Sequence, residues 1–421
     1  MSTRRVVVGL GMKDLLNVIS TLSFSKQEME ENTMILNLLD EICIKDIEPY
    51  AQDMDKTGCK YDGNSGRVVW PDQTYKILEQ LKKNDLLGLA IPEEYNGFGR
   101  SFTLNNACYE RISRADAGTS LLFGLQNSAS DVLETFGTEE AKQYYLPKLA
   151  SGEKIGGLLF TEPGAGSDLG SLKTRVEDNG DHYLVNGSKN FISNSGIANT
   201  FIFLASTDPE KGSKGLTAFI LDTDDNKGAR ITRIEEKLGL HSNATGEILL
   251  EDAVIPKANL LGEINRGFSI VLYELSAARI GIGAQGVGIA DAAYRKSANY
   301  VKTRKQFGRP LESFQITQFK LADMFAKIHT ARVAYLSAAR MKDHKMDFSE
   351  YASIAKLYGS EIAQQVTYEA IQLHGGYGYI RDYDVERYYR DARITPIYEG
   401  TNEVQRIVIS RAEMKKNYGS N

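Results

Sequence analysis

The chain has 421 residues, of which 42% are hydrophobic and 25% charged, and its formal net charge of −5 gives no reason to expect nucleic acid or an anionic membrane as a partner. The three cysteines form no CxxC pair and, like the five histidines, show no metal-ligand spacing. We therefore expect a globular enzyme without metal, disulfide framework or membrane span, in a reducing compartment that is cytoplasmic, or the mitochondrial matrix in a eukaryote.

The first third of the chain is dominated by apolar residues at helical spacing. A Gly- and Asn-rich stretch at 56–70 predicts a loop, and "IPEEYNGFGR" at 91–100 predicts a turn. The helical spacing runs through 26–55, 72–90 and 108–149. This region therefore predicts an N-terminal helical domain.

The hydrophobic period changes near Gly156. Short apolar or alternating runs, punctuated by Gly, Asn, Asp and Ser, predict strands in an all-β unit. These runs are 182–195, 200–207, 216–223 and 246–256. Helical spacing then returns in three long stretches and a shorter fourth, which predict a bundle. Those stretches are 267–304, 315–343, 350–376 and 402–416.

The predicted fold class is α+β multidomain, with a helical domain, a middle all-β domain and a C-terminal four-helix bundle. The expected boundaries are an N-terminal extension at 1–24, then domains at 25–155, 156–266 and 267–421.

Three glycine patterns could bind a nucleotide. "VVVGLG" at 6–11 follows a strand-like run but lacks the third glycine of the motif. Gly281 to Gly286 fits GxGxxG, but a helical run precedes it where a dinucleotide fold needs a strand, so close helix packing is the better interpretation. "TEPGAGSD", Thr161 to Asp168, combines glycines with hydroxyls that could contact an anion or a flat heterocycle. Its alternative is an ordinary surface turn.

Three further motifs are ambiguous in isolation. "RKQFGRPLESFQ" could be a charged loop, and "QLHGGYGY" could be a helix end with core aromatics. Glu399 in "RITPIYEGTNEVQR" precedes a helix whose N-cap is Thr401 or Asn402, and acidic residues are favoured at helix starts whatever their role.

Together these motifs are specific. "TEPGAGSD", "NGSKNFISN", "KLGLHSNATGEILLEDAVIP", "RKQFGRPL", "QLHGGYGY" and "RDARITPIYEGTNEVQR" occur in this order. The chain resembles acyl-CoA dehydrogenases, especially the short- and medium-chain, butyryl-CoA dehydrogenase-like branch. The resemblance implies the same three-domain order, FAD as cofactor, an acyl-CoA thioester as substrate, electron-transferring flavoprotein as redox partner, and a homo-oligomer, usually a tetramer.

The resemblance also implies which residues touch FAD. Some would lie around the isoalloxazine ring, some at the pyrophosphate, and some on a neighbouring subunit's adenosine half. The cofactor residues would be Phe160, Thr161, Gly166, Ser167, Phe191, Ser193, Arg304, Gln306, Phe307, Gln315, Gln372, Gly375, Gly376, Thr401 and Glu403. The residues around the acyl-CoA would be Ser167, Ser276, Arg279 and Gly400.

In the branch that this chain resembles, the catalytic base is the Glu of "IYEGT", here Glu399. Another branch carries its base just before the arginine that matches Arg279, and this chain has Ala278 there. The implied reaction is α-proton abstraction by Glu399 with β-hydride transfer to flavin N5, giving a trans-2-enoyl-CoA.

Other functions remain open at this stage. The same site could work as an enoyl-CoA reductase or accept cyclic, aromatic or dicarboxylic acyl groups. The fold could also serve as a non-catalytic flavoprotein-docking subunit, or as a relative that oxidises nitroalkanes or amines.

Overall fold

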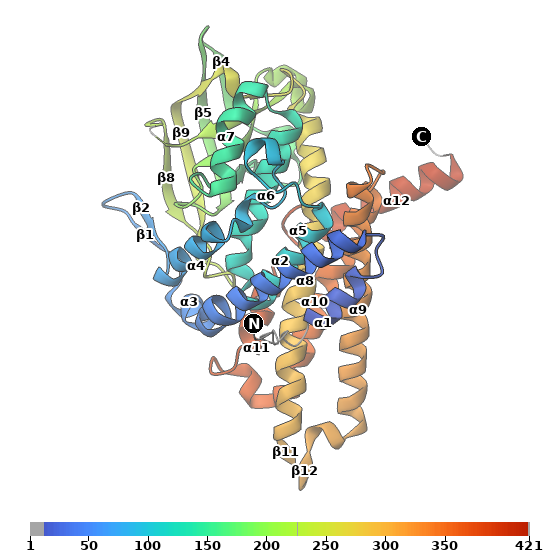
Figure 1. Cartoon of the computed structure of the whole chain (residues 1–421). Coiled ribbons are helices and arrows are strands. Elements are labelled where there is room, and N and C mark those ends of the chain that lie inside the picture. The colour runs from blue at the N-terminus through green and yellow to red at the C-terminus, as the bar shows by residue number, and fades with distance from the viewer. Residues whose placement is uncertain (1–11, 225, 420–421) are drawn as a thin grey trace, which may run out of the picture.

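The computed structural model describes residues 12–224 and 226–419, and these form an N-terminal helical region, a β-sheet region and a long helical bundle (Figure 1). Part of the expected N-terminal extension, residues 1–11, lies outside the described residues. The predicted three-part architecture is confirmed.

The N-terminal region is helical, as its spacing predicts. Helix α2 begins with a capping box, in which the Ser25 side chain accepts from the Glu28 N–H and the Glu28 carboxylate accepts from the Ser25 N–H. The helices are α1 (Met12–Ile19), α2 (Lys26–Ile42), α3 (Ala51–Thr57), α4 (Asp72–Lys83), α5 (Phe102–Ala115), α6 (Ala117–Phe136) and α7 (Glu139–Ser151).

The loop predicted at 56–70 is wrong in its middle, where a hairpin forms. Strands β1 (Lys60–Asp62) and β2 (Arg67–Val69) pair antiparallel, with Tyr61 opposite Val68. The hairpin is held against the β region because the Tyr61 hydroxyl donates to the Ile231 carbonyl at 3.0 Å and the Trp70 indole N–H donates to the Ser195 carbonyl at 3.0 Å. Tertiary packing of two aromatics thus outweighs the local Gly and Asn content.

The middle region is one eight-stranded sheet in the order β10-β7-β6-β4-β5-β9-β8, with β3 pairing parallel to β6. The four predicted strands are present as β5, β6, β7 and β9, and four short or weakly patterned strands were not predicted. The strands are β3 (Gly156–Leu159), β4 (Arg175–Asp178), β5 (His182–Ser193), β6 (Thr200–Ser206), β7 (Leu216–Asp222), β8 (Ala229–Ile234), β9 (Thr245–Pro256) and β10 (Leu260–Leu261).

The C-terminal bundle contains the four predicted helices and a short helix, α11, that was not predicted. The helices are α8 (Gly267–Thr303), α9 (Gln315–Asp343), α10 (Ser349–His374), α11 (Val385–Ala392) and α12 (Asn402–Tyr418), and a small hairpin, β11 (Lys305–Gln306) and β12 (Arg309–Pro310), joins α8 to α9. Along the described chain, no helix has the length and apolar content needed to cross a membrane.

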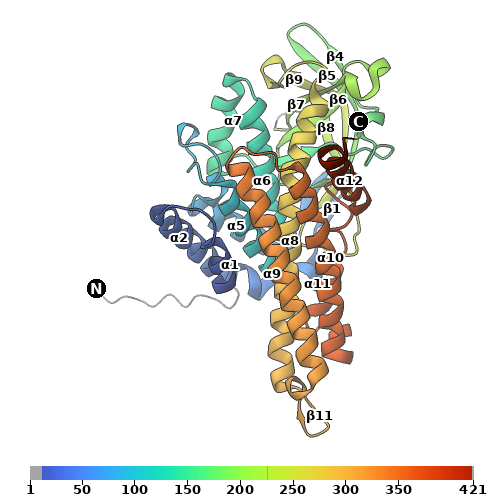
Figure 2. The ribbon, with the colours of Figure 1, turned by 90° about the vertical axis from the view of Figure 1, so that its right-hand side faces the viewer.

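Helix α8 is the axis of the molecule and runs from the sheet to the far tip of the bundle (Figure 2). The packing interpretation of its glycines is confirmed, because a Cβ on Gly283 would lie 2.9 Å from the Ala355 carbonyl of α10, and one on Gly286 would lie 2.5 Å from the Gly359 carbonyl. Helices α5 and α6 also contact α8, and the candidate site lies where these three helices meet.

Candidate active site

Glu399 sits in a tight turn between α11 and α12. Its backbone is left-handed, with φ of 53°, and Gly400 follows with φ of 85°. A Cβ on Gly400 would lie 2.7 Å from the Gln405 side-chain nitrogen, which donates to the Gly400 carbonyl at 2.8 Å. Thr401 is the N-cap of α12 and accepts from the Val404 N–H. A non-glycine residue held at positive φ is strained, and such strain collects at functional sites.

The Glu399 side chain lies in the wall of a cavity between the N-terminal helices and the bundle. Glu399 is half-buried and shares this wall with Tyr398 and Ser193. The other lining residues come from α5, α6 and α8. They are Phe102, Asn105, Asn106, Tyr109, Leu121, Gly124, Leu125, Asn127, Ser128, Asp131, Glu274, Ala277, Ala278, Gly281 and Ile282.

Burial and two nearby cations act on the pKa of Glu399. Burial raises the pKa of the Glu399 carboxyl, and the charges of Lys356 and Arg279 act in the opposite direction. The Lys356 ammonium is itself buried and donates to the Asn402 side-chain oxygen at 2.8 Å. Burial lowers the pKa of Lys356 to about 7. The raised pKa makes the Glu399 carboxylate a stronger base than an exposed one.

Tyr398 fixes the other side of the turn. Its hydroxyl donates to the Gln285 side-chain oxygen, and the Gln285 amide donates to the Ala117 carbonyl at 3.3 Å. Burial raises the pKa of Tyr398 well above its usual value, so this hydroxyl stays protonated as a donor. The turn before Glu399 is thus tied to both α8 and the start of α6.

The sheet contributes an exposed aromatic beside the cavity. Phe191 is 61% exposed and has φ of 59°, at an irregularity in the pairing of β5 with β9. Ser193, two residues on, reaches the cavity. An exposed ring on strained backbone next to a cavity is suited to packing against a flat ligand.

Hydrogen bonds hold the "TEPGAGSD" turn in place, while the space over its glycines is open. Glu162 accepts from the Lys189 ammonium at 2.8 Å and from the Lys173 N–H at 2.7 Å, and Lys189 also donates to the Phe160 carbonyl at 3.1 Å. Among the described residues, nothing lies within 4 Å of a Cβ built on Gly164 or Gly166. Thr161 is half-buried, and Gly166 and Ser167 are exposed. The turn is a rigid rim that leaves space over its glycines.

A second group of predicted cofactor residues lies around the β11–β12 hairpin, which forms the far tip of the bundle, and at the end of α10 (Figure 1). The guanidinium of Arg304 lies 5.3 Å from the centre of the Tyr377 ring, which brings the start of the hairpin beside the turn after α10. Phe307 is 93% exposed. This group does not reach the Glu399 cavity within one chain. It comprises Arg304, Gln306, Phe307, Gln315, Gln372, Gly375 and Gly376.

None of the predicted acyl-CoA residues lines the cavity, although Gly400 directly follows Glu399 in its wall. Arg279 is buried, and its guanidinium donates to the Ser353 hydroxyl at 3.4 Å. The Ser276 hydroxyl donates to the Leu272 carbonyl of its own helix at 2.8 Å, and Ser276 does not line the cavity. Glu403, which was predicted to contact the cofactor, is exposed on the first turn of α12.

Several functional candidates were missed by the motif search. Lys356 and Glu274 belong to no quoted motif, and neither do the cavity asparagines of α5 and α6. One signal existed for Glu274: it stands three, four and seven residues before Ala277, Ala278 and Gly281, so helical geometry places it on the same face as small residues. A charged residue in such a stripe marks a buried polar site.

The chain matches three descriptions of one protein family along most of its length. Residues 29–153 match the acyl-CoA dehydrogenase N-terminal domain, 157–253 the middle domain and 265–414 the C-terminal domain. The chain is also similar to subunit CarC of the caffeyl-CoA reductase-Etf complex of Acetobacterium woodii. That similarity is 40% identity over 81% of this chain and 90% of the relative.

Two solved structures extend this similarity to the fold. Butyryl-CoA dehydrogenase from Megasphaera elsdenii has a TM-score of 0.86 at 36% identity, covering 93% of this chain and 99% of that one. An acyl-CoA dehydrogenase complexed with FAD from Bacillus anthracis has a TM-score of 0.85 at 33% identity, covering 94% of this chain and 68% of that one.

Proposed function

Because the chain belongs to the acyl-CoA dehydrogenase family, a family of flavin-dependent oxidoreductases, we propose that it oxidises the Cα–Cβ bond of an acyl-CoA to a trans-2-enoyl-CoA, with Glu399 as the base. The observation that carries this proposal is the strained turn at Glu399. It holds the Glu399 carboxyl in the wall of a cavity that eighteen residues line.

Glu399 removes the α-proton in this proposal. Such a proton is a very weak acid, so the base works best with a pKa near the working pH, and burial raises the pKa of Glu399 in that direction. The charges of Lys356 and Arg279 lower the pKa of the Glu399 carboxyl and so limit this rise. The Glu399 backbone N–H would donate to the thioester oxygen as negative charge develops there.

The residues present fit FAD. Phe191 offers an exposed ring, Ser193 a hydroxyl beside the cavity, and the turn at Gly164 and Gly166 an open, braced rim. Phe160, Thr161, Gly166, Ser167, Phe191, Ser193, Thr401 and Glu403 would hold the cofactor near the cavity. FAD, when bound, would supply the acceptor for the β-hydride. Tyr398 and Phe191 would help to exclude water from the site.

The second predicted cofactor group requires a neighbouring chain. Arg304, Gln306, Phe307 and Gln315 would contact the adenosine half of a partner's FAD, and Gln372, Gly375 and Gly376 its pyrophosphate. None of these residues lines the Glu399 cavity, so their use in FAD binding would need a homo-oligomer, which we propose to be a tetramer. Electron-transferring flavoprotein is the proposed redox partner, as the name of the Acetobacterium woodii complex suggests, and the cytoplasm (or mitochondrial matrix) the proposed location.

The same site could run in reverse. CarC is part of a caffeyl-CoA reductase, and a base that removes an α-proton also returns one. Reduction of an enoyl-CoA is therefore the second candidate function.

Anaerobic titration tests the proposal. Purified protein should be yellow, and a saturated acyl-CoA from a panel of chain lengths should bleach the flavin absorbance without oxygen. Under the second candidate, an enoyl-CoA should instead restore the colour of the reduced enzyme rapidly. Colourless protein that cannot be reconstituted with FAD, or yellow protein that no CoA ester bleaches or restores, would overturn the assignment.

A further inference from the structure

Glu274 on α8 lines the same cavity as Glu399 and is 2% exposed. Neither of its carboxylate oxygens has a hydrogen-bond partner of ordinary geometry among the described residues. The Ser128 hydroxyl on α6 lowers the pKa of Glu274, against the larger effect of burial, which raises it. A buried, ionisable side chain without a partner is expensive, so its presence in a cavity indicates that a ligand completes it.

In the described chain, asparagine side chains also present oxygens without hydrogen-bond partners to this cavity. The side-chain nitrogens of Asn106 and Asn127 each donate at 2.9 Å to the carbonyl four residues earlier in their own helix, and Asn105 does so at 3.5 Å. Turning these amides over would bring two oxygens together, so the contacts fix their orientation. The buried side-chain oxygens of Asn105 and Asn127 are left without a donor in the described chain.

The other acidic groups around the cavity each have a cation near them. Asp131 on α6 accepts from the Lys342 ammonium of α9 at 2.6 and 2.7 Å. Glu399 lies in the field of Lys356 and Arg279. Arg279 also attracts Glu274, but neither the Arg279 Nε nor a Glu274 oxygen has a hydrogen-bond partner among the described residues. Burial and the charge of Glu399 together raise the pKa of Glu274 well above its usual value.

Taken together, the cavity offers acceptors that need donors: two carboxylate oxygens and two amide oxygens. We infer that the acyl group carries a protonated amine beyond its β-carbon, and that this ammonium donates to Glu274 and to the Asn105 and Asn127 oxygens. The inference rests on the proposed function, because it assumes that the acyl chain occupies this cavity. An ammonium has three donors and no acceptor, which matches a lining of this kind.

Isosteric ligand pairs isolate the ammonium. We would measure binding of 6-aminohexanoyl-CoA against heptanoyl-CoA, and of 7-aminoheptanoyl-CoA against octanoyl-CoA, since each pair differs only by an ammonium in place of a methyl group. Calorimetry on the FAD-loaded Glu399→Gln variant gives affinities without turnover. For at least one length, the amine should bind about tenfold to a hundredfold more tightly than its neutral partner, as expected for charge-assisted hydrogen bonds.

Glu274→Gln, built on the same background, should abolish or invert that preference, because the amide keeps the shape and removes the charge. Glu274→Leu is the second variant if the first fails to fold. Glu263→Gln makes the same chemical change on an exposed residue just before α8 and should keep the preference. Equal binding within both pairs, or a preference that survives Glu274→Gln, would refute the inference.

This outcome is separable from the proposed function. If heptanoyl-CoA or octanoyl-CoA bleaches the wild-type flavin while the amines show no advantage, the dehydrogenase assignment stands and the inference about Glu274 is lost. If no CoA ester of either kind reacts or binds, both are lost.

Discussion

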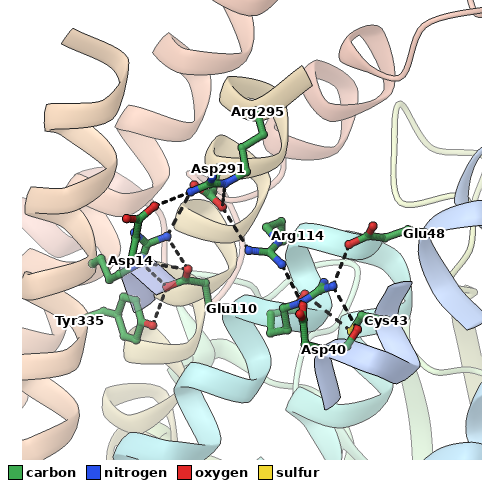
Figure 3. A network of polar contacts seen from close by, with 11 residues as sticks. Asp14, Asp40, Cys43, Glu48, Glu110, Arg114, Asp291, Arg295 and Tyr335 are labelled. Atoms are coloured by element: carbon green, nitrogen blue, oxygen red, sulfur yellow. Dashed lines mark hydrogen bonds and ion pairs between the residues drawn. The ribbon is translucent and has the colours of Figure 1, made fainter. Parts of the chain in front are cut away.

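Two regions of the helical core treat their buried carboxylates in opposite ways. In one, Glu110 of α5 accepts from Arg332 at 2.6 Å and from the Tyr335 hydroxyl at 2.6 Å, within a network that joins α1 and α2 to the bundle (Figure 3). In the other, Glu274 of α8 faces the cavity and has no such partner in the described chain.

The network is closed within the fold. Asp291 of α8 accepts from Arg295 at 2.9 Å and lies 3.5 Å from Arg114, and Arg295 reaches Asp14 at 2.6 Å (Figure 3). The carboxylates of this network each have at least one cation partner. Glu274, with neither oxygen hydrogen-bonded in the described chain, lies in the cavity wall, and this difference helps to separate structural from functional charge without any motif.

The largest expected effect comes from opening the network. Arg332→Met leaves Glu110 as a buried charge without its ion pair, and we expect a loss of about 3–5 kcal/mol in stability because desolvation is no longer compensated. Thermal unfolding measures it as a clear fall in the midpoint. Arg230→Met, which breaks an exposed pair with Glu251, is the control and should change little. An unchanged midpoint in Arg332→Met would show that the network is not structural.

Removing the carboxylate in the cavity should change stability in the opposite direction. Glu274→Leu removes a buried carboxyl that has no partner in the protein, so we expect the free energy of unfolding to stay the same or rise by about 1–3 kcal/mol. The same thermal measurement, without ligand, checks it. A loss of stability as large as that of Arg332→Met would mean that Glu274 is a structural residue like Glu110, and the contrast between the two regions would disappear.

A smaller effect concerns pH. Glu399 must be ionised to take a proton, so the rate of flavin reduction should rise with pH through its raised pKa. Lys356 lowers that pKa, so Lys356→Met should move the rise to higher pH. Because burial lowers the pKa of Lys356 to about 7, the two proteins should differ most below neutrality.

The pH dependence of anaerobic flavin reduction measures this shift. Lys320→Met, which removes a lysine paired with Glu369 on the bundle surface, is the matched control. A rise that stays in place, or moves to lower pH, in Lys356→Met contradicts the role given to this ammonium.

Much of the fold could be predicted because its signals are local. The period of apolar residues located the long helices and the four well-patterned strands. The β1–β2 hairpin could not be predicted, since Tyr61 and Trp70 are held by partners more than a hundred residues away. Strand β8 is half-exposed throughout most of its length and shows little alternation, so no periodic signal marks it.

The candidate site shows the same contrast between local motifs and long-range contacts. Glu399 and the glycine turn lie in contiguous motifs, so they could be named in advance, while their contacts with FAD and acyl-CoA remain predictions. Lys356 and the asparagines could not be named, because their role depends on which hydrogen bonds the fold completes. The small residues around Glu274 could have marked it as buried, but not as lacking a partner in the described chain. Whether Asn127 has a free oxygen depends on the helix carbonyl that its amide contacts, which no motif records.

The most direct test of the central claim is the single-turnover rate of anaerobic flavin reduction in Glu399→Gln, with the acyl-CoA that best bleaches the wild type. The amide keeps the shape of the side chain and cannot accept the α-proton. We predict normal FAD content, acyl-CoA binding within a few-fold of wild type, and a rate reduced by about 10²–10⁴-fold. Reduction at the wild-type rate would show that another group takes the proton and that Glu399 is not the base.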